Sequence, residues 1–217
     1  MADFTIYIGN RNYSSWSLRA WLMLKHSGAR FKEVVIPLYE PNSRAEIMRV
    51  SPSGKVPAVK HGKVVVWDSL AIGEYLAETF PKSLLWPASI PARALARAVS
   101  NEMHSGFMDL RRHLPMNLRR SPVPRPLTQE VQADLNRVAA LWRDCRKRFG
   151  RGGPYLFGKF GIADAMYAPV VSRIRSYRVV VDQDAGDYCD AITKHPAYQE
   201  WVAAAKNEPM VVEKFEV

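Results

Sequence analysis

The stretch from Ser53 to Ser69 restricts the fold more than any other part of this chain. It begins with Ser53-Gly54-Lys55-Val56-Pro57-Ala58-Val59, continues through the β-branched run Val64-Val65-Val66-Trp67 and ends with Asp68-Ser69. Apolar side chains then recur at helical spacing, at Leu70, Ile72, Tyr75 and Leu76. We predict a strand, a tight turn, a second strand and then a helix that begins at Asp68-Ser69.

The same stretch contains the elements of a binding site. Pro57 has no backbone N–H to donate, whereas Val56 has one, and a cis Val56-Pro57 bond would turn the N–H and C=O of Val56 outward to pair with an extended peptide. Asp68-Ser69 would stand at a helix N-terminus, where hydroxyl and backbone N–H groups receive a carboxylate. These features together predict a site for a small acidic peptide.

The first 80 residues read as a βαβ unit followed by a ββα unit. Phe4–Ile8 predicts a first strand, and Leu18, Trp21, Leu22 and Leu24 predict a helix that the preceding serines can cap. Phe31–Pro37 predicts a second strand, parallel to the first because a helix connects the two. A short helix capped by Asn42 or Ser43 follows. We therefore expect a compact α/β domain with a mixed sheet, as in the thioredoxin-like fold.

After residue 80 the pattern becomes helical. Prolines at positions 81, 87 and 91 indicate a linker, so we predict an α/β domain over 1–81, a linker over 82–91 and an all-α helical bundle over 92–217. Met103, Phe107, Leu110 and Leu114 step along one helical face. A second long helix should end near Gly150, a third should contain Pro169 and a last one should contain Pro196 and Trp201.

Composition and charge exclude several classes of protein. No run approaches the roughly 18 apolar residues of a membrane span, and the N-terminus lacks the pattern of a secretion signal. The net charge of +10 comes without a nucleic-acid-binding motif, so it indicates a solvated helical face that attracts small anions. Cys145 and Cys189 lie outside any CxxC pattern, which favours a reduced cytoplasm. The five histidines have no metal-ligand spacing, and we expect no metal.

Four motifs in order resemble those of the glutathione S-transferase family. Residues 53–59 resemble its Val–cis-Pro motif, and Asp68-Ser69 resembles its Glu/Asp-Ser pair. Ser14-Ser15-Trp16-Ser17 resembles the serine-type active site, closest to the zeta class and its bacterial members. Gly161-Ile162-Ala163-Asp164 resembles the capping box of the second domain, with Gly161 in place of the usual Ser or Thr. The resemblance extends over essentially the whole chain.

This resemblance implies glutathione as co-substrate. Val56, beside Pro57, would pair through its backbone with the cysteinyl part of glutathione, Asp68 and Ser69 would hold the γ-glutamyl end, and Lys55 would bind the glycine carboxylate. It also implies a homodimer and a glutathione transferase that activates the thiol for attack on small electrophiles, with two alternatives. One is a maleylacetoacetate-type isomerase, and the other is a non-catalytic binding protein on the same fold.

The thiol-activating hydroxyl has two candidates. The zeta pattern points to Ser14, whereas counting back from Arg19, as in theta-like sequences, points to Ser15; we prefer Ser14. One of the two is expected to cap the helix, and Tyr13 is a third candidate. No cysteine precedes residue 145, so a cysteine nucleophile of the omega type is absent. The electrophile pocket is expected between the domains, at Tyr13 and at the residues Met103, His104, Phe107, Met108 and Arg111, although such an apolar stripe is more often core.

Overall fold

The N-terminal third of the chain contains a four-stranded mixed sheet. The computed structural model describes residues 3–217 and shows β1 (Phe4–Ile8), β2 (Phe31–Val35), β3 (Ala58–His61) and β4 (Val64–Val66). The strand order is β2-β1-β3-β4, in which β1 pairs parallel with β2 and antiparallel with β3. With α1 (Ser15–Ser27), α2 (Ser43–Met48) and α3 (Ser69–Thr79), this is the expected thioredoxin-like domain.

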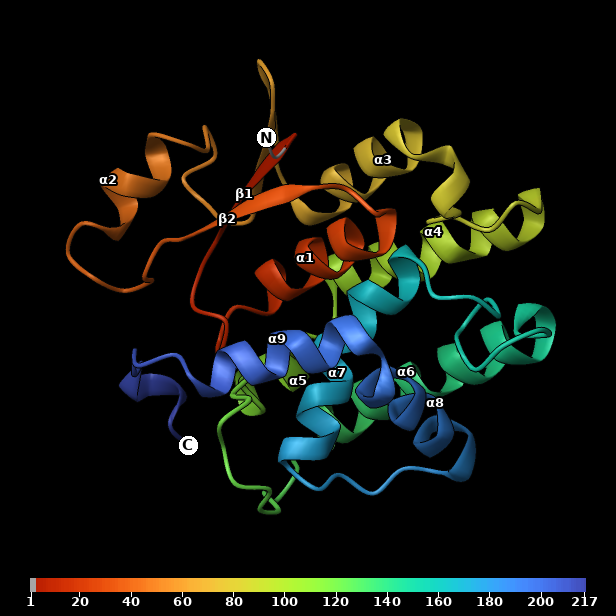
Figure 1. Ribbon diagram of the computed structural model, residues 1–217. Helices are drawn as coiled ribbons and strands as arrows, with labels where there is room; N and C mark the ends of the chain where they lie inside the picture. Colours follow the sequence, from red (N-terminus) through yellow and green to blue (C-terminus); the bar gives the residue numbers. More distant parts are fainter. Residues whose placement is uncertain (1–2) are drawn as a thin grey trace.

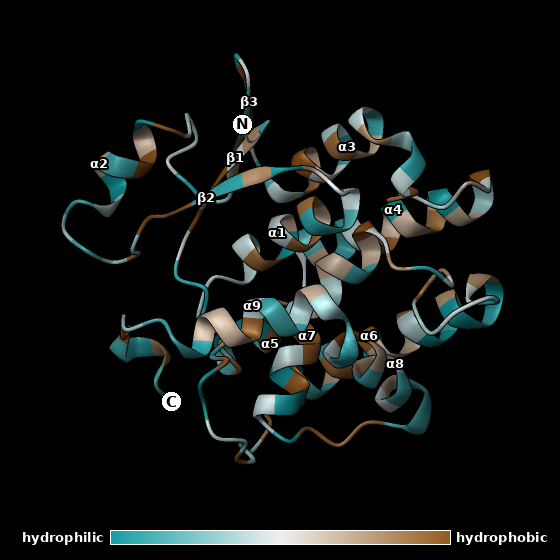
Figure 2. Ribbon diagram, in the orientation of Figure 1, coloured by the Kyte–Doolittle hydropathy of each residue, from teal (hydrophilic) through white to brown (hydrophobic). Residues whose placement is uncertain are grey.

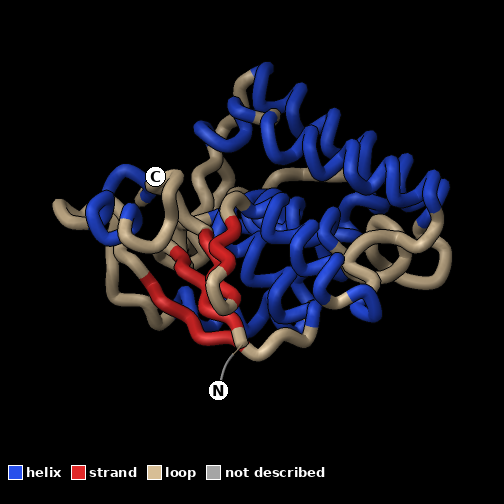
Figure 3. Tube along the Cα trace, turned by 90° about the horizontal axis from the view of Figure 1, so that it is seen from above, coloured by secondary structure: helices blue, strands red, loops and turns tan. Residues whose placement is uncertain are grey.

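Helices make up the rest of the chain. After the short 3₁₀ turn η1 (Pro81–Ser83) come α4 (Ile90–Ser105), α5 (Met108–His113), α6 (Gln129–Phe149), α7 (Ile162–Ser176), α8 (Gln183–Lys194), α9 (Pro196–Lys206) and the 3₁₀ turn η2 (Glu213–Phe215). The helical second domain is confirmed. Figure 3 shows the strands gathered on one side and most of the helices on the other.

Helix α7 lies at the centre of the shared core. Every residue from Ile162 to Ile174 is buried, and α7 packs against α1, α4 and α8. In Figure 1, α1 lies between the sheet and the C-terminal helices, while α2 lies away from those helices. The helices around α7 carry hydrophobic and hydrophilic residues on the same element, as amphipathic helices around one core do (Figure 2).

A buried carboxylate organises the start of α7. Asp164 accepts hydrogen bonds from the backbone N–H of Gly161 (3.0 Å) and of Leu156 (3.1 Å) and from the Tyr188 hydroxyl (3.0 Å). The first of these bonds is the one expected from the capping motif. Burial raises the pKa of Asp164 to about 7, and the three hydrogen bonds oppose that shift.

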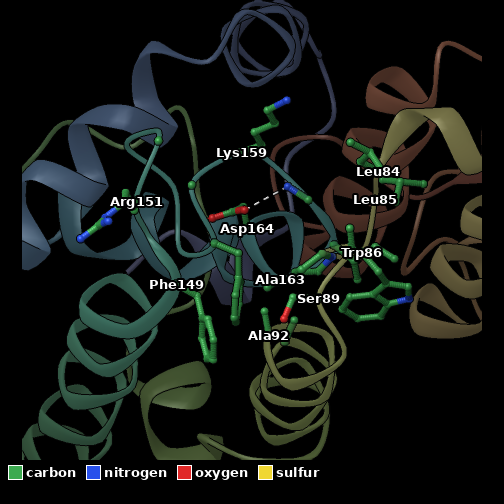
Figure 4. Close-up of a pocket in the computed structure, with 18 residues that line it drawn as sticks. Leu84, Leu85, Trp86, Ser89, Ala92, Phe149, Arg151, Lys159, Ala163 and Asp164 are labelled. Atoms are coloured by element: carbon green, nitrogen blue, oxygen red, sulfur yellow. Dashed lines mark hydrogen bonds between the residues drawn. The ribbon is translucent and has the colours of Figure 1, made fainter.

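Steric crowding explains why position 161 is occupied by glycine. A Cβ at this position would lie 2.7 Å from the carbonyl oxygen of Leu85, which accepts a 2.9 Å hydrogen bond from Ile162 N–H. The linker backbone at Leu85 therefore lies too close to position 161 for the Cβ of serine or threonine. Figure 4 shows the cavity of about 340 Å³ beside this turn, with Asp164, Trp86 and Phe149 among its labelled residues.

Replacing Asp164 tests this account of the α7 N-terminus. Asp164→Ala removes three hydrogen bonds to one carboxylate and leaves buried donors unpaired, so we expect it to lower the free energy of unfolding by about 3 kcal/mol or more. Urea unfolding measures the change. The matched variant Asp187→Ala removes an exposed carboxylate whose partner is the Gln183 side chain, and it should change stability by less than about 0.5 kcal/mol. Equal effects of the two variants would contradict the account.

Candidate active site

The largest hollow near the predicted site residues is an open cleft of about 870 Å³. One wall is the loop after β2 together with α2, and the other includes the turn at 53–57. Trp16 from the first turn of α1, Asp68 from the start of α3 and His104 from α4 complete the lining. Of the residues predicted from the sequence to bind or react, the structure places Lys55, Val56, Pro57, Asp68 and His104 in this cleft.

The turn before β3 presents free backbone groups to the cleft. The Val56-Pro57 peptide bond is cis, as is Trp67-Asp68. Among residues 3–217, no hydrogen bond joins the N–H or C=O of Val56 to a loop or turn partner. Lys55 is exposed beside it and lines the cleft. This edge can accept an extended peptide and a carboxylate.

Asp68 is the N-cap of α3. Its Oδ1 accepts a 3.0 Å hydrogen bond from Leu70 N–H, and its Oδ2 lies 2.9 Å from His104 Nε2. Ser69, predicted to act with Asp68, is fully buried and does not line the cleft, but its hydroxyl has no hydrogen-bond partner among the described residues. A hydroxyl at a helix N-terminus can donate to a carboxylate, but because Ser69 is fully buried it can do so here only after a local movement exposes it.

The two candidate serines differ in their contacts. Ser14 is the N-cap of α1: its hydroxyl accepts from Ser17 N–H at 3.3 Å and donates to the Ser17 hydroxyl at 2.8 Å. Ser15 is partly exposed, and the described residues provide no hydrogen-bond partner for its hydroxyl. Neither serine is among the lining residues of the cleft, whereas the next residue, Trp16, is.

Tyr13 lies outside the cleft. Its ring is buried, and its hydroxyl donates to the Glu216 carboxylate while accepting from Arg119 (2.9 Å) and from Val212 N–H (3.3 Å). Tyr13 therefore anchors the C-terminal segment of residues 207–217, which runs back to the first domain (Figure 1). With its hydroxyl fully occupied, Tyr13 has no free proton to offer a thiol.

The predicted apolar face from Met103 to Leu114 is interrupted. Helix α4 ends at Ser105, and the chain passes through Gly106 and Phe107, which has a positive φ of 58°, before α5 begins. Met103 and Phe107 are buried in the hydrophobic core, and Met108 is exposed outside the cleft. The expectation of one continuous helical face from Met103 to Leu114 was therefore wrong, and none of these three residues lines the cleft. Only His104 of this face reaches the cleft.

Arg111 connects the cleft to a second, basic hollow. Its guanidinium lies 5.1 Å from the centre of the Trp16 ring and donates to the carbonyls of Met103 and His104. The hollow has a volume of about 350 Å³ and is lined by Arg111, Arg112, Arg125 and Lys214, together with Pro115, Phe215 and Val217. None of these lining residues is acidic. The buried Nε of Arg111 has no partner within residues 3–217.

The cysteines are not placed for chemistry. Cys145 and Cys189 are both buried and free, and burial raises the pKa of each thiol to about 12. Within the described part of the chain, no three His, Cys, Asp or Glu side chains are grouped to hold a metal ion. No helix in the same part of the chain is long and apolar enough to cross a membrane.

Family models match both the sheet domain and the helical domain of this chain. The model described as "Glutathione S-transferase, N-terminal domain" matches residues 13–79, and "Glutathione S-transferase, C-terminal domain" matches residues 128–204. The chain belongs to the glutathione S-transferase family. Members of this family are generally glutathione transferases.

Individual relatives are distant. "Glutathione S-transferase 1" of Dianthus caryophyllus is 27% identical, with 76% of this chain and 75% of that protein covered. A maleylacetoacetate isomerase of Rattus norvegicus is also 27% identical, with 80% and 79% covered. Among solved structures, a Burkholderia glutathione transferase homologue with bound glutathione has a TM-score of 0.72 at 23% identity, covering 94% of this chain and 98% of that one. This last likeness shows that the fold is shared.

Several lining residues had no signal in the sequence. The loop after β2 and helix α2 contribute Tyr39, Glu40 and Arg44 to the cleft, and no sequence motif marks these positions. Glu208 was also missed: its buried carboxylate accepts from the backbone N–H of Arg11 (2.8 Å) and of Asn12 (3.0 Å). The loop that carries the candidate serines is therefore held by a residue almost 200 positions away.

Glu208→Ala tests the role of this carboxylate. The variant loses two charge-assisted hydrogen bonds and leaves two backbone donors near the serines unpaired. We expect the free energy of unfolding to fall by about 3 kcal/mol. Thermal and urea unfolding provide the measurement. Glu213→Ala, an exposed carboxylate in the same segment, serves as the control and should be close to neutral; a neutral Glu208→Ala would mean that the segment does not support the loop.

Proposed function

We propose that this protein is a glutathione transferase that activates the glutathione thiol with a serine hydroxyl at the start of α1. The observation that carries the proposal is the combination found in one cleft. A backbone edge at Val56, a carboxylate at the N-terminus of α3 and an exposed cation at Lys55 lie beside the first turn of α1.

Each part of glutathione has a complementary group in this arrangement. The peptide group of the cysteinyl residue pairs with the N–H and C=O of Val56. The γ-glutamyl carboxylate is received at the N-terminus of α3, where the Ser69 hydroxyl has no partner among the described residues, and its ammonium group faces Asp68. The glycine carboxylate is bound by Lys55, and Arg44 of α2 adds a second cation to the lining of the cleft.

Activation of the thiol requires a moderate amount of free energy. A free cysteine thiol has a pKa of about 8.5, and only its thiolate is a strong nucleophile. Lowering this pKa by about two units takes roughly 2.7 kcal/mol of preference for the anion. One hydroxyl that donates to the sulfur, together with the positive end of α1, supplies about this much.

The contacts favour Ser15 over Ser14 as the donor. The Ser14 hydroxyl already donates to Ser17 while it caps α1, so using it for the thiol would break that bond. The Ser15 hydroxyl has no such partner in the described residues and precedes Trp16, which lines the cleft. This reverses the preference for Ser14 that the zeta pattern alone suggests.

An ultraviolet titration of the bound thiol distinguishes the two serines. Reduced glutathione is first added at pH 7 to the wild type, to Ser14→Ala and to Ser15→Ala, and the thiolate absorbance is recorded. The pH of each complex is then varied to obtain the pKa of the bound thiol. We expect Ser15→Ala to raise the pKa of the bound thiol by about one to two units with little change in glutathione affinity. Loss of the signal in Ser14→Ala alone would assign the role to Ser14. A wild type without any thiolate signal would favour the non-catalytic alternative.

A glutathione-dependent isomerase of the maleylacetoacetate type is the second candidate. Two observations favour it: the similarity to the rat maleylacetoacetate isomerase over most of both chains, and the basic hollow behind Arg111. An electrophile that carries carboxylates would find several cations there and no acidic lining residue. Turnover of maleylacetoacetate separates this activity from general conjugation.

Arg111→Met tests whether the basic hollow takes part. Methionine keeps much of the apolar stem and removes the charge. For an electrophile with a carboxylate we expect KM to rise by about tenfold or more, because the loss of a charged hydrogen bond is worth roughly 1.5–3 kcal/mol. A neutral electrophile should show a change below about threefold. Equal losses for both electrophiles, measured by steady-state kinetics, would exclude a charge-specific role for Arg111.

Three further expectations stay predictions, of which the first rests on the family resemblance and the other two on the cysteines and the sequence pattern. These are the homodimer, the cytoplasmic location and the domain limits at 1–81, 82–91 and 92–217. One contact bears on the last of them: the carbonyl of Leu85, in the linker, accepts a 2.9 Å hydrogen bond from Ile162 N–H at the start of α7.

A further inference from the structure

His104 reaches the cleft from the helical half of the molecule. It lies in the last turn of α4, and its Nε2 is 2.9 Å from Asp68 Oδ2. Both residues line the cleft. The other oxygen of Asp68 accepts from Leu70 N–H as the cap of α3. The carboxylate is thus held from two sides, by its own helix and by an imidazole from a different part of the chain.

The surroundings of His104 favour the neutral form of its ring. Burial lowers the pKa of His104, and the charges of Arg19 on α1 and Arg111 on α5 lower it further, against the opposing effect of Asp68 on α3. A neutral ring whose Nε2 faces a carboxylate carries its proton on that nitrogen. The Nδ1 atom is buried without a partner in the described residues, and the ring edge contacts Trp16 at 5.0 Å between ring centres.

A neutral donor has a specific advantage beside a carboxylate that must bind a cation. Lysine or arginine at this position would orient Asp68 but would also cancel its charge. A neutral imidazole N–H fixes one oxygen and leaves the full negative charge of Asp68 available.

We propose that His104 is a positioning residue for glutathione: its Nε2–H holds the Asp68 carboxylate in the orientation that receives the ammonium group of the γ-glutamyl end. This role rests on the glutathione binding proposed above. It adds a residue of α4 to a site otherwise built from the first domain, and it links the orientation of Asp68 to the packing of Trp16 against α4.

Binding of S-methylglutathione, which has no thiol to titrate, tests this role apart from catalysis. Calorimetry at pH 7.5 compares the wild type with His104→Phe, which keeps a ring against Trp16 but has no donor, and with His104→Gln, which keeps a neutral N–H donor. We expect His104→Phe to weaken binding by about tenfold or more, because the donor bonds to a charged group. His104→Gln should recover to within about threefold of the wild type. His26→Gln, which alters a histidine outside the cleft, should bind as the wild type does.

Two further measurements separate positioning from general damage. In an Asp68→Asn background, which keeps a capping side chain, His104→Phe should weaken binding by no more than about twofold, because its partner carboxylate is already gone. In the wild type, affinity should fall as the pH drops below the pKa of His104, because the imidazolium then neutralises Asp68. His104→Gln should show no such fall between pH 5 and 7.5.

Each outcome decides a separate question. A wild type that does not bind S-methylglutathione would overturn the proposed function and with it this role. Normal binding by His104→Phe, when the wild type binds, would overturn the role of His104 alone. A full additional loss in the Asp68→Asn background would show that the ring supports the fold and does not position Asp68. If His104→Phe does not fold, His104→Gln still decides through its pH profile, and an acid fall identical to that of the wild type would overturn the proposal.

Discussion

The packing of α1 between the sheet and α7 is the constraint on which the rest of the structure depends. One side of α1 meets the sheet domain and α3, and the other meets the fully buried face of α7. Arg19, completely buried in α1, donates from Nε to the carbonyl of Met166 on α7 at 3.1 Å. Because a closely packed protein interior resists small displacements, this packing fixes the first turn of α1 relative to the sheet and to the C-terminal helices. That turn carries the candidate serines and Trp16.

Side chains from distant parts of the chain then complete the site around this turn. Glu208 holds the loop before α1, Tyr13 ties the same loop to Glu216, and His104 reaches across from α4 to Asp68. Each contact joins the sheet domain to the helical part through a charged or polar group. The proposed chemistry needs a hydroxyl, a backbone edge and a carboxylate at fixed separations, and these links provide the required rigidity.

Several cationic side chains are concentrated around Trp16, which is an unusual electrostatic feature of this site. Burial lowers the pKa of Arg19 well below its usual value, and the nearby charges of Arg111 and Arg173 lower it further. The Trp16 ring lies within 4.5 Å of the Arg19 guanidinium and 5.1 Å of that of Arg111, measured to the ring centre. An aromatic face stabilises such cations in part. An anionic thiolate or carboxylate bound nearby would balance them more completely.

The secondary structure of the first domain could be predicted from the sequence because local patterns determine it. The strand at Phe4–Ile8 and the helix that begins at Ser69 were both expected, and so was the parallel direction of the first two strands, which a helix connects. The helix break at Gly106 and Phe107 could not be predicted, because the apolar spacing continues through it. The four apolar residues of this spacing, Met103, Phe107, Leu110 and Leu114, are all buried although they do not share one helix. The partners of Tyr13 and Asp68 were equally inaccessible, since Glu216 and His104 become neighbours only through tertiary packing.

The position of bound glutathione is the most direct test of the whole account. A crystal structure of the protein with reduced glutathione should show the cysteinyl backbone paired with Val56, the glutamyl end at Asp68 and Ser69, and the sulfur within hydrogen-bond distance of the Ser15 hydroxyl. Glutathione bound in the same cleft with its sulfur turned away from α1 would contradict the proposed activation. Glutathione bound elsewhere, or absent at saturating concentration, would contradict the assignment of the cleft itself.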